Sequence, residues 1–291
     1  MGQSILPDRP TLLRNTRCPY CGEDLATAPS DRDHVIGRRF VPKGSLSKSW
    51  NLILCACRRC NTIKSDLEDD LSAISMQPDA WGTHAADDPA LKESSVRKAA
   101  GSLSRRTGRP VAASQEQFQL AASPGPGMRF TVTFTSPPQM DPVRASELAR
   151  LQMMALFYWL TYNPKQQSGR WWVGGFFPFP WLPRSDWGNA TKAGFTSAVK
   201  DWDSWTCVCA AGGYFKAMLR RAPDIPCWAW ALEWNRRVRL FGFLGEEDAA
   251  LSVLNSLPPT EVAEFVDEKG SVWRHRQDTP LPDEEDRLFV L

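Results

Sequence analysis

The chain has 291 residues, of which 42% are hydrophobic, and a formal net charge of +2 at pH 7. This length is typical of about two domains, and the apolar content is that of a globular protein with a sizeable core, which excludes a disordered or fibrous chain. Eight cysteines in a chain of this length exclude a dense disulfide framework and favour a reducing compartment.

The chain shows no sign of a membrane segment. Its most apolar run, residues 151–160, is too short to cross a bilayer, and the N-terminus has no secretory pattern. We therefore expect a cytoplasmic protein that makes no contact with membrane.

The first motif along the chain is a pair of Cys-x-x-Cys sequences. Cys18 and Cys21 form one, and Cys57 and Cys60 form the other. Two such turns can place four thiolates around one ion, so they predict a closed, structural Zn²⁺ site. Cys55 lies outside this spacing and is expected to be a buried thiol, although it could replace Cys57 as a ligand.

Two apolar runs and one helical pattern follow. Asp33 and His34 precede an apolar pair, so they can lie at the end of a strand, and residues 51–54 are typical of a buried strand. Residues 58–76 have helical apolar spacing, in which Asn61 and Lys64 share a face. The apolar positions of this helix are Ile63, Leu67, Leu71 and Ile74. The prediction is strand, strand, helix, held at its base by zinc.

These motifs, in this order, resemble the signature of the HNH nuclease family, whose fold is the ββα-metal finger. The resemblance covers residues 17–76 and includes a zinc Cys-x-x-Cys, an acidic–His doublet, an asparagine before an apolar strand and Cys-x-x-Cys-Asn-x-x-Lys. It implies that His34 is the general base and that Asp33 and Asn61 bind a catalytic Mg²⁺ or Mn²⁺. It also implies that Asn51 braces the loop and orients the imidazole, and that Lys64 lies near phosphate.

The residue types suit this chemistry. A neutral imidazole can take a proton from water near pH 7, and a hard divalent ion prefers carboxylate and amide oxygens. Taken alone, His34 could be a hydrogen-bonded core histidine, and Asn51 and Asn61 could be turn or cap residues. Their position between two zinc pairs favours the catalytic interpretation.

The chain departs from the family pattern at two places. Gly37 stands where many members have proline. The segment from Asn51 to Cys57 is one residue longer than the commonest form, which leaves the choice between Cys55 and Cys57 open.

Charge is distributed unevenly along the chain. Residues 1–65 contain 11 basic and 5 acidic residues, a net charge of +6, whereas residues 246–291 contain 4 and 12, a net charge of −8. A basic nuclease end fits contact with nucleic acid, and the family resemblance favours DNA. The residues expected to contact DNA are Arg38, Arg39, Lys43, Lys48 and Arg58.

Beyond the motif we expect a linker at residues 77–127, with a basic helix at 89–104, and a break at Ser-Pro-Gly-Pro-Gly, residues 123–127. Residues 128–291 would form an α+β domain of unknown role. The patterns predict a strand at 130–134, a helix at 142–162, paired strands at 228–234 and 238–242, and a helix at 246–257. Eleven of the thirteen tryptophans follow residue 150, which favours a Trp-rich core over exposed stacking platforms.

The sequence as a whole therefore predicts an α+β protein with an N-terminal HNH domain, residues 1–76, that cuts DNA with a divalent ion. Restriction or phage defence is the setting we expect for it. One alternative is a zinc-stabilised module that binds nucleic acid without cutting it. Another is a toxin or effector nuclease whose C-terminal domain senses a protein or a small molecule.

Overall fold

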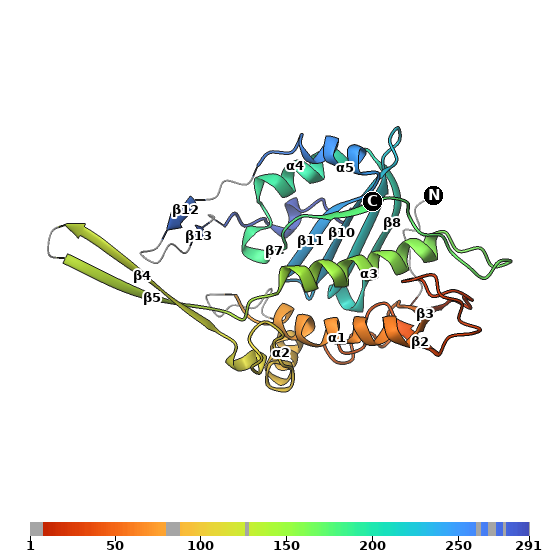
Figure 1. Ribbon diagram of the computed structural model, residues 1–291, viewed down its shortest axis with the longest axis horizontal. Helices are drawn as coiled ribbons and strands as arrows, with labels where there is room; N and C mark the ends of the chain where they lie inside the picture. The colour runs from red at the N-terminus through yellow and green to blue at the C-terminus, as the bar shows by residue number, and fades with distance from the viewer. Residues whose placement is uncertain are drawn as a thin grey trace.

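The computed structural model describes residues 8–79, 88–125, 128–259, 263–266, 272–275 and 278–290 (Figure 1). It contains both helices and sheets, which confirms the predicted α+β class. In the described part of the chain, every helix is too short or too polar to cross a membrane.

The N-terminal part is a small sheet followed by a long helix. Strands β1 (Thr11–Leu12), β2 (Ser30–His34) and β3 (Leu52–Cys57) form the order β1-β3-β2, with β2 antiparallel and β1 parallel to β3. Helix α1 (Arg58–Ser75) follows β3 directly. The predicted order of strand, strand and helix is therefore confirmed, with His34 as the last residue of β2.

One part of that prediction is wrong. Ile63, expected on the apolar face of the helix, is 47% exposed, whereas Leu67, Leu71 and Ile74 are buried. The core contacts of α1 lie further along the helix, because its first turns are occupied by the cysteines and by the polar cleft described below.

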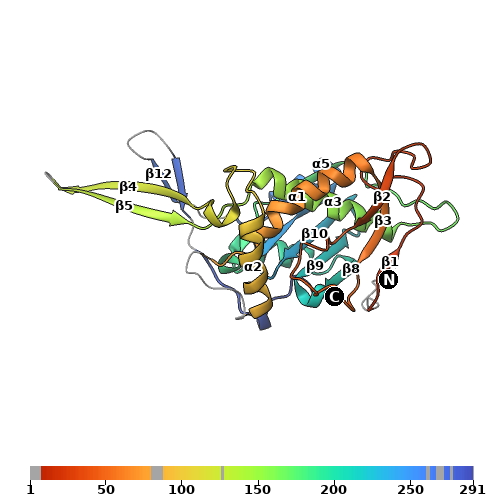
Figure 2. The same cartoon turned by 90° about the horizontal axis from the view of Figure 1, so that it is seen from below.

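The connector carries a helix and a long hairpin. Helix α2 (Pro89–Gly101) begins at the N-cap Asp88, and the short 3₁₀ helix η2 (Val111–Ala113) leads to strands β4 (Glu116–Gly125) and β5 (Met128–Ser136). The predicted strand at 130–134 is confirmed, but its partner β4 lies in the stretch expected to be linker. Figures 1 and 2 show this hairpin extending away from the rest of the chain.

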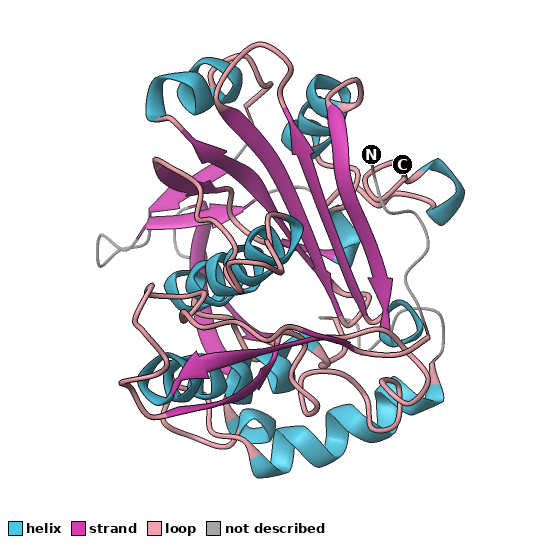
Figure 3. Ribbon diagram, turned by 90° about the vertical axis from the view of Figure 1, so that its right-hand side faces the viewer, coloured by secondary structure: helices cyan, strands magenta, loops and turns pink. Residues whose placement is uncertain are grey.

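The C-terminal part is built on a six-stranded antiparallel sheet (Figure 3). Its central order is β6-β11-β10-β9-β8, with β7 also paired to β11. The strands are β6 (Gly175–Pro178), β7 (Leu182–Pro183), β8 (Asp203–Ala210), β9 (Phe215–Arg221), β10 (Cys227–Trp234) and β11 (Val238–Gly245). The predicted pairing of the last two is confirmed, with Trp234 opposite Val238.

Helices cover both faces of this sheet. Helix α3 (Pro142–Leu160) packs on one face, and α4 (Ala190–Val199) and α5 (Glu247–Leu254) contribute to a second apolar cluster on the other. Strands β12 (Ala263–Val266) and β13 (Val272–His275) form a separate pair, and the 3₁₀ helices are η3 (Arg184–Asp186), η4 (Ala211–Gly213) and η5 (Asp283–Glu285). Trp187, Trp230 and Trp234 are almost fully buried, so the Trp-rich core is confirmed at these positions.

The ββα unit and the large sheet share one apolar core. Phe40 meets the edge of the Trp234 ring, with ring centroids 5.3 Å apart, and Trp50 lies 5.1 Å from Trp159 of α3. Asn235, in the β10–β11 turn, donates to the carbonyl of Phe40 at 3.0 Å. A single cluster of buried residues therefore runs from Leu13 to Leu244.

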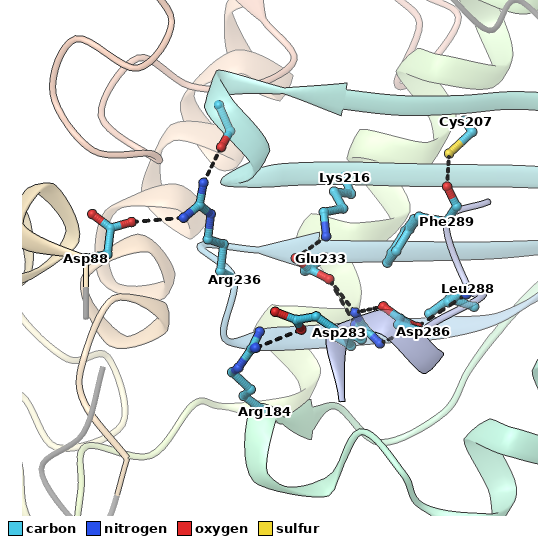
Figure 4. A network of polar contacts seen from close by, with 12 residues as sticks. Asp88, Arg184, Cys207, Lys216, Glu233, Arg236, Asp283, Asp286, Leu288 and Phe289 are labelled. Carbon is cyan, nitrogen blue, oxygen red and sulfur yellow. Dashed lines mark hydrogen bonds and ion pairs between the residues drawn. The ribbon is translucent and has the colours of Figure 1, made fainter. Parts of the chain in front are cut away.

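The acidic C-terminal stretch forms ion pairs with the folded sheet. Arg239 of β11 is fully buried, pairs with Glu233 at 2.7 Å and with Asp286, and stacks 3.4 Å above the Trp187 ring. Figure 4 shows Glu233 and Asp286 converging in this network, with Lys216 on the other side of Glu233. Asp286 of this stretch thus helps to neutralise a buried basic side chain of the sheet.

Candidate functional site

The four cysteines of the two Cys-x-x-Cys motifs meet at one point. The sulfur atoms of Cys18, Cys21, Cys57 and Cys60 all lie within 4.8 Å of one another, and those of Cys21 and Cys57 are 3.6 Å apart. Tetrahedral thiolate coordination at about 2.3 Å places sulfurs roughly 3.8 Å apart, so this set fits a metal ion such as zinc. Cys57, rather than Cys55, belongs to the cluster.

The local backbone explains this convergence. The first pair lies on a turn closed by a hydrogen bond from the amide of Gly22 to the carbonyl of Cys18, 2.9 Å, and Gly22 has a φ of +79°, which favours glycine. Cys57 ends β3, and Cys60 lies in the first turn of α1. Burial raises the pKa of Cys57 to about 11 and also raises that of Cys60, and a bound cation would favour the thiolate form of both.

A second polar site lies beside this cluster, in a cleft of about 620 Å³. Asp33 and His34 reach it from the end of β2, and Asn61 reaches it from the first turn of α1. Asn61 is 27 positions from His34 in the sequence, and antiparallel pairing of β2 with β3, which α1 follows directly, brings it to the cleft that Asp33 and His34 line. The structure thus places the predicted base and both predicted metal ligands on one cleft.

His34 is half-buried at the junction of this cleft with a neighbouring cavity of about 360 Å³. Its Nε2 accepts a hydrogen bond from Nε of Arg38 at 3.2 Å. Burial, followed by the positive charge of Arg38, lowers the pKa of His34 below its ordinary value. This shift favours the neutral imidazole at pH 7, the form that can accept a proton.

Asn51 is buried and holds the loop that follows His34. Its Oδ1 accepts from the amide of Ile36 at 3.1 Å, and its Nδ2 donates to the carbonyl of the same residue at 2.8 Å. Both of these bonds are to backbone, so Asn51 acts on His34 through the loop. This is the bracing position that the family resemblance implies for it.

Asp33 is almost fully buried, with an exposed fraction of 5%, and both of its carboxylate oxygens accept hydrogen bonds. Its Oδ2 accepts a hydrogen bond from the hydroxyl of Tyr20, and its Oδ1 accepts one from Nζ of Lys64 at 3.1 Å. Burial and the charge of Asp33 raise the pKa of Tyr20 well above its ordinary value, so the phenol remains a donor. Asp33 and Asn61 offer the hard oxygen atoms that Mg²⁺ or Mn²⁺ prefers.

Lys64 is buried between Asp33 and Glu68. Its exposed fraction is 1%, and its ammonium group bonds to Asp33, to the carbonyl of His34 at 2.9 Å and to Glu68 at 2.7 Å. Burial opposes its charge, but the carboxylates of Asp33 and Glu68 prevail and raise its pKa. Three acceptors within the protein thus use its three hydrogens, and a contact of Lys64 with phosphate stays a prediction of the family resemblance.

The basic residues divide into two groups. Arg38 and Arg39 line the cleft, whereas Lys43, Lys48 and Arg58 are exposed outside it, with Arg58 paired to Asp31 at 3.3 Å. Three further cations line the cleft and were not selected from the sequence. They are Arg32, Lys98 and Arg105.

Two of these further cations, Lys98 and Arg105, come from the connector. The basic helical pattern of the connector is the sequence feature that could have pointed to them. Lys98 of α2 donates to the hydroxyl of Ser72 at 2.6 Å, and burial lowers its pKa to about 8. Arg105 pairs with Asp66 at 2.7 Å. Their position in the cleft depends on packing of α2 against α1, which sequence periodicity does not reveal.

Comparison of the chain with protein-family models, with curated proteins and with solved structures finds no match. The geometry of the cysteine cluster and of the Asp33–His34–Asn61 cleft is therefore the basis for assigning a function.

Proposed function

We propose that this protein is a metal-dependent endonuclease of the HNH type, which hydrolyses phosphodiester bonds of DNA. One observation carries the proposal: Asp33, His34 and Asn61 line the same cleft, next to a cluster of four cysteines. A module that only bound nucleic acid would have no need of a neutral histidine beside paired oxygen ligands.

His34 would act on the attacking water. Its neutral imidazole accepts the proton while the water oxygen forms a bond to phosphorus and the bond to the leaving sugar oxygen breaks. The leaving oxygen then takes a proton from solvent. Asn51 keeps the loop at Ile36 fixed, so that the ring of His34 keeps its direction during this step.

Asp33 and Asn61 would hold the divalent ion with a carboxylate and an amide oxygen. When bound, Mg²⁺ or Mn²⁺ would offset the negative charge that builds up on the phosphate and on the leaving oxygen. Asp33 keeps lone pairs available for this role, since each of its oxygens accepts one hydrogen bond and can offer a second lone pair.

Arg38 would couple substrate binding to the base. The lone pair of Nε2 that would take the water proton now accepts from Arg38. A phosphate group is a stronger acceptor for a guanidinium group than a neutral imidazole is, because both partners are charged. Arrival of a phosphate would therefore draw Arg38 away and release Nε2.

The test is cleavage of supercoiled plasmid by the full chain with Mg²⁺, with Mn²⁺ and with a chelator. We expect nicked or linear DNA only with the divalent ion. His34→Ala should reduce the rate by roughly 10²–10⁴-fold, the usual effect of removing a general base, and extra metal should not restore it.

The matched pair Asp33→Asn and Asp31→Asn separates ligand loss from a general loss of charge. Both residues are on β2, but Asp31 is exposed outside the cleft. Only Asp33→Asn should weaken cleavage, with partial recovery at high metal concentration. Cleavage by His34→Ala at the wild-type rate would contradict the proposal, and tight binding without cleavage would favour the binding module.

A further inference from the structure

The carboxylate of Asp33 is held from two sides by residues far from it in the sequence. Tyr20 donates to Oδ2, and Lys64 donates to Oδ1 at 3.1 Å. All three side chains are buried, with exposed fractions of 6% or less. The carboxylate is thus fixed in one orientation, with its remaining lone pairs available on the cleft side.

Tyr20 connects the cysteine cluster to the carboxylate of Asp33. It lies inside the first Cys-x-x-Cys motif, between Cys18 and Cys21, so its backbone position is set by the turn that presents those two sulfurs. The carbonyl of Pro19 in the same turn accepts from the indole of Trp171 at 2.6 Å, which holds the turn against the C-terminal part of the chain. A short covalent path therefore joins the structural metal cluster to the hydroxyl that holds Asp33.

Lys64 is held in turn by Glu68, one helical turn later in α1. The carboxylate of Glu68 also lies against the loop after His34. A Cβ atom added at Gly37 would come 2.2 Å from its Oε2, closer than any side chain tolerates. Glycine at this position is what lets Glu68 approach.

We propose that Tyr20 and the Lys64–Glu68 pair are positioning residues of Asp33 that set the affinity of the cleft for its divalent ion, and that Tyr20 links this affinity to the cysteine cluster. This inference rests on the proposed function, since it gives Asp33 the role of metal ligand. Partners that orient a metal ligand typically account for 10–100-fold in metal affinity. Such an effect would be absent if Tyr20 served only to fill space in the core.

The test measures binding of Mn²⁺ to the zinc-loaded full chain without DNA, from the EPR signal of free Mn²⁺. Asp33→Ala identifies the site, because it should abolish the binding. Tyr20→Phe should keep its zinc and its fold but bind Mn²⁺ at least about tenfold more weakly. Tyr162→Phe, which removes a hydroxyl that donates to the carbonyl of Arg14, should stay within twofold of wild type.

Gly37→Ala tests the Lys64–Glu68 pair without changing the turn that holds Cys18 and Cys21. Its methyl group would displace Glu68, so Mn²⁺ affinity should fall while zinc is retained. Gly101→Ala is the control, since a Cβ there meets no other atom within 4 Å. Plasmid cleavage by Tyr20→Phe should recover at high Mn²⁺, with DNA affinity unchanged.

The possible outcomes distinguish failure of this inference from failure of the proposed nuclease function. If Tyr20→Phe and Gly37→Ala bind Mn²⁺ as wild type does while wild type cuts DNA, the positioning role is overturned and the nuclease stands. If Tyr20→Phe loses its zinc, Tyr20 is a structural residue of the turn and the positioning role is again overturned. If wild type shows no Mn²⁺ binding that depends on Asp33, both proposals fail together.

Discussion

Nε of Arg38 donates to Nε2 of His34 over 3.2 Å, so an exposed cation covers the lone pair of the proposed base. Burial of His34 and the charge of Arg38 both lower the pKa of the imidazole. At about pH 6.5, where an ordinary histidine is half protonated, cleavage should therefore be largely retained, and it should be lost only at lower pH.

Replacement of Arg38 should change the pH below which cleavage is lost. Arg38→Ala removes a neighbouring positive charge, so the pKa of His34 should rise and the acid side of the cleavage profile should shift to higher pH. Arg39→Ala, which removes the next cation along the cleft, is the control. Profiles of the two variants that coincide with wild type would show that Arg38 has no influence on the base.

Zinc bound at the cysteine cluster should be required for the N-terminal fold. Structural zinc contributes on the order of 10 kcal/mol to the folding of small domains, so Cys60→Ser should lose zinc and unfold the region around β2, β3 and α1. Cys55→Ser should retain one zinc per chain, because Cys55 is outside the cluster. Zinc content by elemental analysis and protection from proteolysis would measure both, and loss of zinc from Cys55→Ser would reverse the choice of ligand.

Residues 1–76 should not fold alone, even with zinc. Phe40 and Trp50 are buried by Trp234 and Trp159 of the C-terminal part, and a fragment would expose both rings to water. We expect poor dispersion of its NMR spectrum or aggregation, in contrast to the full chain. A well-dispersed spectrum of the zinc-loaded fragment would show that the shared core is dispensable.

Arg144 of α3 should stabilise the contact between α3 and α1. It pairs with the buried Asp70 at 2.9 Å and with Asp66 at 3.0 Å. Arg144→Ala leaves the carboxylate of Asp70 with fewer donors and should cost roughly 1–3 kcal/mol in the free energy of unfolding. The exposed Arg170→Ala should have little effect in the same urea titration, and equal midpoints for the two variants would argue against this role.

The two groups of basic residues should differ in DNA binding. Removal of one phosphate contact lowers the slope of log affinity against log salt concentration by about 0.9. Arg39→Ala, in the cleft, should show this change. Arg58→Ala should not, since Arg58 lies outside the cleft and pairs with Asp31. The same loss of slope in both variants would extend the contact surface beyond the cleft.

The sequence by itself determined the local features of this protein. The paired Cys-x-x-Cys spacing, the Asp33–His34 doublet and the helical spacing after Cys57 each depend on neighbours within one strand or one turn of helix, and each appears where it was expected. The α3 helix and the β10–β11 pairing were likewise visible, because their apolar periodicity follows directly from their burial.

Only the tertiary structure decided the partners of those features. It selected Cys57 over Cys55, enclosed Lys64 between Asp33 and Glu68, and brought Lys98 to the cleft. The sequence patterns did not predict strands β8 and β9. Both faces of their sheet are covered, and buried charged residues such as Arg220 interrupt the alternation of apolar and polar residues that marks a strand. These choices depend on contacts between segments far apart in the chain, and such contacts leave no periodic trace in either segment alone.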